Sequence, residues 1–256
     1  MRKELLKRAV GILAVMLMAV NVQGFGCITE PEEEVKENTA KKMIICIDPG
    51  HQAERDSRGE PVSPGSGSLK ARVSAGTVGV ATKNPEYKVN LEAALILKEM
   101  LDEDKYDVVM TRETNEVNIS NIERAKLANK ANADITVRIH CDSVLDGSKT
   151  GATILIPSRK CINACNIYED SSRFANILKD QLKGESIKVN GVFERADITG
   201  FNWSEVPVVI LEMGFMSNYE EDRMLGDSEY QKKLMGCVKS AIEEFSKEET
   251  KVLEEE

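Results

Sequence analysis

The feature that most constrains the fold is a run of apolar residues at positions 43–47, which ends in Asp48-Pro49-Gly50-His51. A continuous apolar run that is closed by turn residues is typical of a strand buried on both faces of a sheet. Pro49 and Gly50 favour a turn directly after it. His51 is therefore expected just past the carboxyl end of a buried strand, and ligands bind at that edge of open α/β sheets.

Strand-like and helix-like segments alternate along the rest of the chain. Further strands are expected over residues 106–111, 134–139, 151–157 and 206–212, and helices over residues 84–101, 120–131 and 174–182 and near the C-terminus. This alternation predicts a single α/β domain with a mostly parallel sheet and helices on both faces. Residues 52–83 are rich in Gly, Ser and Pro, which indicates a long functional loop next to His51.

Capping residues mark the expected helix starts. Asn84 is expected to cap a helix whose first residue is Pro85. In a capping box, a Ser side chain and a Glu or Gln side chain three positions later each accept a hydrogen bond from the other residue's backbone amide. Such boxes are expected to pair Ser120 with Glu123, Ser217 with Glu220, and Ser228 with Gln231.

The two histidines of the chain, His51 and His140, are both predicted at strand ends. Glu212 ends a third strand, and Glu86 lies in the first turn of a helix. These four side chains are expected to converge, because the carboxyl ends of parallel strands share an edge with the amino ends of the following helices. Two His and one Glu are a familiar catalytic zinc set that leaves one position for water, and a further carboxylate can then act as general base.

Each of these residues also has a structural explanation. A single histidine after a strand is usually structural. Here both histidines of the chain are predicted at strand ends, which favours a metal site. Glu86 could simply stabilise the helix amino terminus through the macrodipole, and Glu92, deeper in the same helix, is a competing ligand. Glu212 follows four apolar residues, and because burying an unpaired carboxylate is costly, it needs a partner or a metal environment.

The ends of the chain differ in composition from its middle. Residues 1–26 have the pattern of a signal peptide or membrane anchor, a basic segment followed by an apolar one. Residues 27–42 form an acidic linker that begins with Cys27, a candidate for lipid attachment, and residues 248–256 form a charged tail. Residues 43–247 are expected to be the catalytic domain, exported and in contact with the membrane only through the N-terminal segment.

The net charge and the positions of the cysteines bear on possible partners and on disulfide bonds. The net charge of −9 argues against nucleic-acid binding, which needs a basic face. Cys161 and Cys165 are four residues apart in an expected loop and are the best-placed disulfide pair in an exported chain. Cys46 and Cys141 lie in or next to apolar strands, where buried free thiols are common.

Several stretches match a known family in order and spacing. They are Ile47-Asp48-Pro49-Gly50-His51, Glu86 with Asn90-Leu91, Val109-Met110-Thr111-Arg112, Arg124 with Ala128-Asn129, Ala133-Asp134 to His140, and Val209 to Asn218. On these motifs the chain resembles the zinc-dependent N-acetylmuramoyl-L-alanine amidases of the amidase-3 family. The resemblance covers roughly residues 43–245.

The resemblance implies a six-stranded twisted sheet and a specific role for each site residue. His51, Glu86 and His140 would be the ligands of one zinc ion, with Glu86 chosen over Glu92 because it precedes an Asn-Leu pair by four residues. Glu212 would be the catalytic carboxylate. The implied substrate is peptidoglycan, cleaved between the lactyl group of N-acetylmuramic acid and L-alanine, and the protein is expected to be a monomer.

Two positions depart from the family pattern, and two other functions remain open. Gln52-Ala53 stand where the family has Gly-Gly, and Asp142 stands where it has Asn. The same ligand set would also serve a zinc-dependent peptidoglycan carboxypeptidase or deacetylase. The other alternative is a non-catalytic wall-binding protein, which predicts a degraded site.

Overall fold

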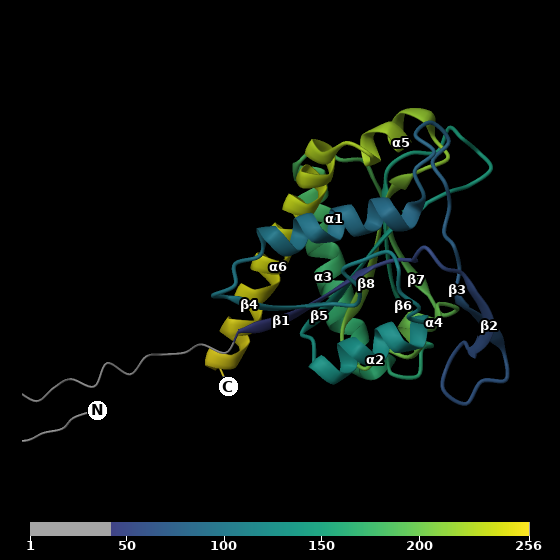
Figure 1. Ribbon diagram of the computed structural model, residues 1–256. Coiled ribbons are helices and arrows are strands. Elements are labelled where there is room, and N and C mark those ends of the chain that lie inside the picture. The colour runs from purple at the N-terminus through teal and green to yellow at the C-terminus, as the bar shows by residue number, and fades with distance from the viewer. Residues whose placement is uncertain (1–41, 256) are drawn as a thin grey trace, which may run out of the picture. The chain divides into compact units, whose positions relative to one another are not determined.

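The computed structural model describes the backbone of residues 42–255 and the side chains of residues 42–248 (Figure 1). The predicted signal peptide or anchor, Cys27 and nearly all of the acidic linker lie outside the described residues. In chain order the elements are β1 (Met43–Pro49), β2 (Asp56–Pro61), β3 (Leu69–Val73), α1 (Glu86–Met100), β4 (Tyr106–Met110), α2 (Asn121–Ala131), β5 (Ile135–Asp142), β6 (Ala152–Pro157), α3 (Ala164–Gly184), β7 (Val189–Arg195), α4 (Thr199–Asn202), β8 (Val208–Phe215), α5 (Tyr219–Leu225) and α6 (Ser228–Glu255).

Six of the strands form one sheet in the order β4-β1-β5-β8-β6-β7. The pairs from β4 to β8 are parallel, whereas β6 and β7 run parallel to each other and antiparallel to β8. This arrangement confirms the predicted single α/β domain with a mostly parallel six-stranded sheet. The carboxyl ends of β1, β5 and β8 therefore share one edge.

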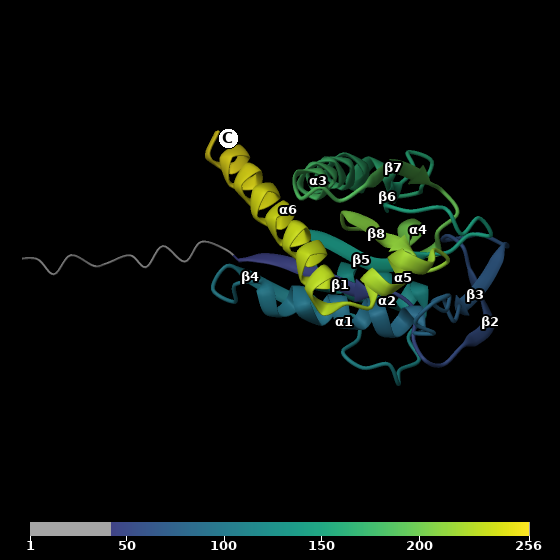
Figure 2. The same cartoon turned by 90° about the horizontal axis from the view of Figure 1, so that it is seen from above.

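Helices cover both faces of the sheet: in Figure 1, α1 lies above the strands and α2 below them, and Figure 2 looks down on the side that α1 and α6 cover. Helices α1, α3 and α6 pack on one face, where the apolar side chains of β1, β5, β8 and β6 form the main core. Burial of this core supplies most of the favourable free energy of folding. Helices α2 and α4 lie on the opposite face over smaller apolar clusters. That second face also holds the buried polar side chains of Asp48 and Arg138, which support the site described below.

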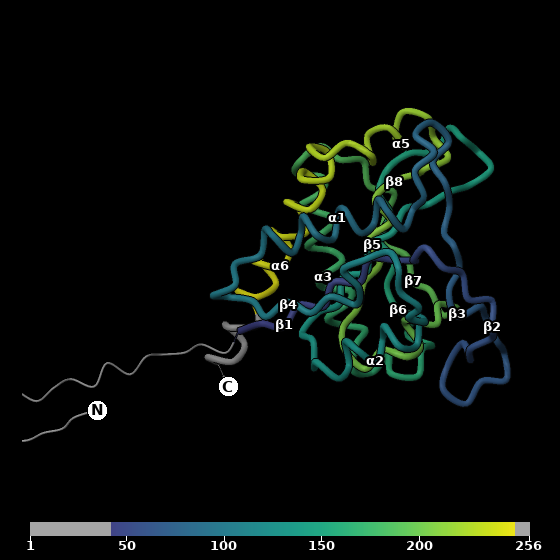
Figure 3. The backbone as a smooth tube through the Cα atoms, in the orientation of Figure 1, coloured from purple at the N-terminus to yellow at the C-terminus, as the bar shows by residue number. Residues whose placement is uncertain are grey.

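The structure corrects the expected loop at residues 52–83. This segment contains an antiparallel hairpin, β2 paired with β3, whose course can be followed in Figure 3. Its two strands have few apolar residues, and much of the hairpin is exposed, so the sequence lacks the period-2 apolar pattern that predicts strands. The edge strand β7 has no counterpart in the sequence prediction for the same reason. It contains Gly191, and Phe193 is half exposed.

Two of the predicted capping boxes and one N-cap are wrong by one residue. Pro85, not Asn84, is the N-cap of α1, because Asn84 belongs to a turn in which its carbonyl accepts from Gly79 N–H. The capping box of Ser120 and Glu123 at α2 is confirmed, with both reciprocal hydrogen bonds present.

Two later helices are also capped by a neighbour of the predicted residue. At α5, Asn218 accepts from Glu221 N–H, whereas the Ser217 hydroxyl accepts from Val144 N–H. At α6, the Asp227 carboxylate accepts from the N–H groups of residues 229 and 230, so Ser228 is the first helical residue. Asn and Asp are at least as good as Ser at N-caps, which explains why they take the position.

The cysteines of the described region are free thiols, and the best-placed pair, Cys161 and Cys165, is not bonded. The Cys161 sulfur faces the Arg195 carbonyl at 3.6 Å, while the Cys165 sulfur contacts Asn166 Oδ1 at 3.3 Å. The α6 backbone is helical to Glu255, through the segment predicted as a charged tail. Within residues 42–255, no helix has both the length and the apolar character needed to span a membrane.

Candidate active site

Two buried arginines hold the turn that follows β1. The carbonyl oxygens of Pro49, Gly50 and His51 accept hydrogen bonds from Arg112 and Arg124 at 2.8–2.9 Å. Because each carbonyl has a charged donor, the backbone that leads to His51 has little freedom. These bonds stabilise the φ of 60° at His51, which lies in the left-handed region that is unfavourable for a residue with a side chain.

Asp48 ties this turn to the rest of the sheet. Its carboxylate accepts from Arg124 of α2 at 2.7 Å, from Arg138 of β5 at 2.6 Å and from the Thr111 hydroxyl at 2.6 Å. Burial alone would raise the pKa of Asp48, but Arg124 and Arg138 hold that pKa well below its usual range. The paired charges offset the cost of burying each ion.

The sequence predicted His140 just after a strand. In the structure it lies within β5, because β5 continues to Asp142. In the parallel register His140 is the partner of Glu212 on β8, which likewise lies inside its strand. The imidazole packs against Gly50, where an added Cβ would lie 2.2 Å from His140 Cε1. Only glycine at position 50 therefore leaves room for the second histidine.

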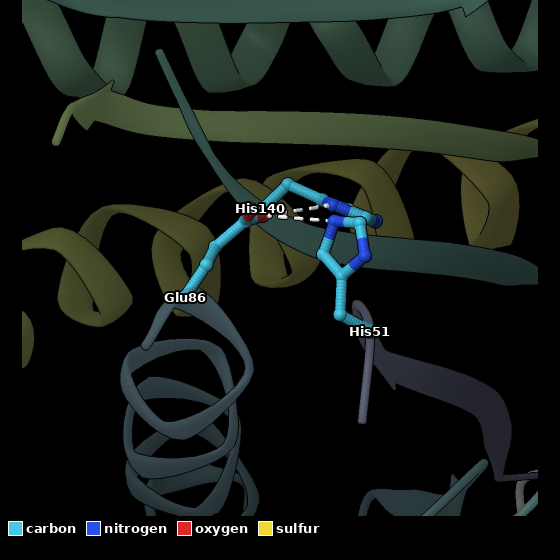
Figure 4. A group of neighbouring side chains, drawn as sticks. All are labelled: His51, Glu86 and His140. Carbon is cyan, nitrogen blue, oxygen red and sulfur yellow. Dashed lines mark hydrogen bonds and ion pairs between the residues drawn. The ribbon is translucent and has the colours of Figure 1, made fainter. Parts of the chain in front are cut away.

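Glu86, the first residue of α1, joins the two histidines (Figure 4). Its Oε1 lies 3.1 Å from His51 Nε2 and 3.3 Å from His140 Nδ1. The ligand atoms that the three residues can offer all lie within 4.8 Å of one another. The competing residue Glu92 is 44% exposed and pairs with Lys88 instead. The structure thus brings the three predicted ligands together and leaves Glu92 away from them.

Backbone and amide groups orient these side chains. His51 Nδ1 lies 3.1 Å from the Ser74 carbonyl oxygen and 3.0 Å from the Ser74 hydroxyl, so Ser74 orients the ring and turns Nε2 toward Glu86. Glu86 Oε1 also accepts from the Asn90 side-chain amide and from Cys141 N–H, both at 3.2 Å. Ser74 lies in the Gly- and Ser-rich segment and has no motif that could have identified it from the sequence.

The protonation states of the three residues suit the binding of a cation. Burial lowers the pKa of His140 to about 4 against the opposing effect of Glu86, so its imidazole is neutral at pH 7. Burial alone would raise the pKa of Glu86, but hydrogen bonds with His140 and His51 hold that pKa well below its usual range. Neutral imidazole and ionised carboxylate are the forms that bind metals.

Glu212 lies beside His140 on the neighbouring strand but is not one of the three grouped residues. Its Oε2 is buried and has no hydrogen-bond partner among the described residues, and the same is true of His140 Nε2. Unpaired buried polar atoms are costly, which indicates a place built for a ligand. Burial, reinforced by Glu86 and Asp142, raises the pKa of Glu212 well above its usual range, as suits a proton acceptor.

The two departures from the family pattern have local structural roles. Gln52 is fully buried, and its side-chain oxygen accepts from Arg124 and from Ile119 N–H, each at 3.1 Å. Asp142 ends β5, where its side chain accepts from Ser143 N–H at 2.7 Å. Neither residue displaces any of the four predicted site residues.

Two imidazoles and a carboxylate, with a proton acceptor next to them at the carboxyl edge of an α/β sheet, define the class of a candidate metal-dependent hydrolase. The N-acetylmuramoyl-L-alanine amidase family, Amidase_3, matches residues 45–244, and the chain belongs to this family.

Related proteins agree with this assignment. The N-acetylmuramoyl-L-alanine amidase Rv3717 of Mycobacterium tuberculosis is 28% identical over 212 residues, which cover 79% of this chain and 86% of that protein. The germination-specific N-acetylmuramoyl-L-alanine amidase of Bacillus subtilis is 25% identical over 219 residues and 78% of each chain. The crystal structure of the amidase Ami1 from Mycobacterium smegmatis has a TM-score of 0.72 at 27% identity, and the match covers 79% of this chain and 96% of that chain.

Proposed function

We propose that the chain is a zinc-dependent cell-wall hydrolase that cleaves the amide bond between N-acetylmuramic acid and L-alanine in peptidoglycan. The observation that carries this proposal is the meeting of His51, Glu86 and His140 next to the unpaired carboxylate of Glu212. Family membership supports the choice of substrate. The complete set of site residues also argues against a non-catalytic wall-binding protein, which would tolerate their loss.

The three grouped residues fit zinc well. Imidazole nitrogen and carboxylate oxygen are common zinc ligands, and catalytic sites typically use three protein ligands and leave a fourth position open. His51, Glu86 and His140 would hold the ion. A bound zinc ion would polarise the scissile carbonyl and lower the pKa of water to about 7.

Glu212 is assigned to proton transfer. Its carboxylate lies beside His140 and is outside the ligand group, so it leaves the open position free. It would accept a proton from the attacking water and return it to the leaving amine of L-alanine. The raised pKa of Glu212 favours the first of these two steps.

Digestion of purified peptidoglycan, followed by mass spectrometry of the products, tests this function. An amidase releases free stem peptides with an L-alanine amino terminus and leaves the glycan strands peptide-free. A carboxypeptidase would shorten the stems from the carboxyl end, and a deacetylase would release acetate. Either of these product patterns, without free stem peptides, would overturn the proposal.

Replacing Glu86 and Glu92 one at a time tests which of the two is the metal ligand. Glu86→Ala is expected to abolish zinc-dependent hydrolysis, because Glu86 supplies the only carboxylate of the ligand group. Glu92→Ala is the matched control on the same helix and should keep most of the activity, since Glu92 pairs with Lys88 at the surface. Hydrolysis rates and zinc content of both variants check this prediction, and the reverse ranking would contradict it.

We also propose that the protein acts outside the cytoplasm, in the cell wall or on the outer face of the membrane. The support is the signal-like composition of residues 1–26 together with a substrate found in the wall. Cell fractionation should find the protein in exported fractions, and a cytoplasmic location would refute the idea. If Cys27 carries lipid, Cys27→Ser should move the protein from the membrane to the soluble exported fraction.

A further inference from the structure

One face of the sheet extends from the site to an open edge. In the paired register, Glu212 of β8 is next to Thr153 of β6, and Thr153 is next to Gly191 of β7. Because side chains alternate along a strand, Phe193 and Arg195 project from the same face of β7 as Gly191. The intervening residue Val192 packs against the main core on the other face, which confirms this alternation.

This part of the face is accessible. Phe193 is 50% exposed, and the Arg195 side chain is 45% exposed. The edge strand β7 ends near the β2–β3 hairpin (Figure 1). A substrate whose scissile bond lies at Glu212 could therefore extend over β6 and β7, with the hairpin on its far side.

Arg195 is held in place by a small charged cluster. Asp197 accepts from Arg195 Nε at 2.8 Å and from Nη2 at 2.9 Å. Lys70 of β3 pairs with the same carboxylate at 3.3 Å and donates to the Asp197 carbonyl. Two cations share one anion, so the cluster keeps a positive charge. Within the described residues, Arg195 Nη1 makes no hydrogen bond and is available to a ligand.

The charge of Arg195 reaches the site. Hydrogen bonding to Asp197 is the main cause of the raised pKa of Arg195, and Glu212 and Asp142 contribute to the same shift. The site itself is rich in carboxylates, with Glu86, Glu212 and Asp142 near one edge. An anionic substrate group would be repelled there and attracted to the face that carries Arg195.

We propose that Arg195 binds a carboxylate of the substrate's stem peptide and makes the enzyme prefer acidic stems over amidated ones. This inference rests on the proposed amidase function, because everything on the alanine side of the scissile bond is then peptide. A planar guanidinium held by a neighbouring carboxylate is preorganised to recognise a second carboxylate.

The test compares two synthetic substrates that differ in one group. Both are N-acetylmuramoyl-L-alanyl peptides, and the residue after alanine carries either a free α-carboxylate or the corresponding carboxamide. The parent protein should favour the carboxylate by roughly five- to tenfold in kcat/KM, a moderate value because the arginine is half exposed. The difference should lie mainly in KM, since the contact forms in the bound substrate as well as in the transition state.

Variants of Arg195 locate the source of this preference. Arg195→Gln should bring the ratio of the two kcat/KM values close to one, whereas Arg195→Lys should keep part of it. The matched control is Arg159→Gln, which removes the same charge from a side chain that is 63% exposed and lies over Tyr168. This control should keep the parental ratio. A general folding defect would slow both substrates equally and would leave the ratio unchanged.

The experiment distinguishes a failure of the role of Arg195 from a failure of the proposed amidase function. Equal kcat/KM values for the two substrates in the parent protein would overturn the role of Arg195, as would a parental ratio in Arg195→Gln. Failure of the parent protein to cleave either substrate would instead refute the proposed function, and the inference would fall with it.

Discussion

Glu212→Gln is expected to reduce turnover by about 10² to 10⁴, the usual contribution of a positioned general base. Glutamine keeps the shape of the side chain but cannot accept the proton of the attacking water. Because Glu212 lies outside the three-residue ligand group, the zinc content should stay near that of the parent. The measurements are single-substrate turnover and metal analysis on the same preparation.

A charge-matched control excludes a general electrostatic effect. Glu169→Gln removes a carboxylate that is 76% exposed on α3, and it should leave turnover close to the parental value. Loss of metal from Glu212→Gln would show that Glu212 is a ligand, and the role assigned to Glu86 would then have to be reconsidered. Unchanged turnover would remove Glu212 from the mechanism.

His140→Ala is expected to lose both bound zinc and activity. Removing a ligand leaves two, and zinc affinity should fall by more than the 10- to 100-fold that is typical when a group supporting a ligand is removed. The imidazole is also packed against Gly50, so the substitution opens a cavity beside the turn. Circular dichroism should therefore accompany the zinc and activity measurements, to separate metal loss from unfolding.

His51→Ala provides the matched comparison. His51 lies in the turn that follows β1, whereas His140 is inside β5, so the two substitutions disturb different parts of the structure. Both variants should nevertheless fail in the same way, with a folded domain that holds little zinc. A folded variant of either residue that keeps a full equivalent of zinc would contradict its role as a ligand.

The sequence predicted the parallel sheet and the convergence of the site because both depend on strong local signals. The apolar run before Asp48, and the similar runs before His140 and Glu212, are long enough to identify buried strands. Parallel topology then places their carboxyl ends at one edge. Glu86 and Glu92 both lie on the same predicted helix, and only the family spacing distinguishes Glu86 as the ligand.

Other features depend on long-range contacts that leave no local pattern. Ser74 orients His51 only because the chain after β3 returns to the turn that follows β1, and Asn84 does not cap α1 because its carbonyl accepts from Gly79 N–H in a turn. Strand β7 lies at a sheet edge with Phe193 exposed, so it lacks the apolar run that revealed the buried strands. The support of the β1 turn by Arg112 and Arg124 also required the folded structure.

Hydrolysis is expected to need one zinc ion, held by His51, Glu86 and His140. The most direct test removes metal from the purified protein with a chelator and returns zinc stepwise while amide cleavage of peptidoglycan is measured. Activity should vanish on removal and return in proportion to added zinc, reaching a plateau at about one equivalent per chain, as expected for a three-ligand catalytic site. Full activity in the metal-free protein, or a plateau that requires two equivalents, would contradict the account.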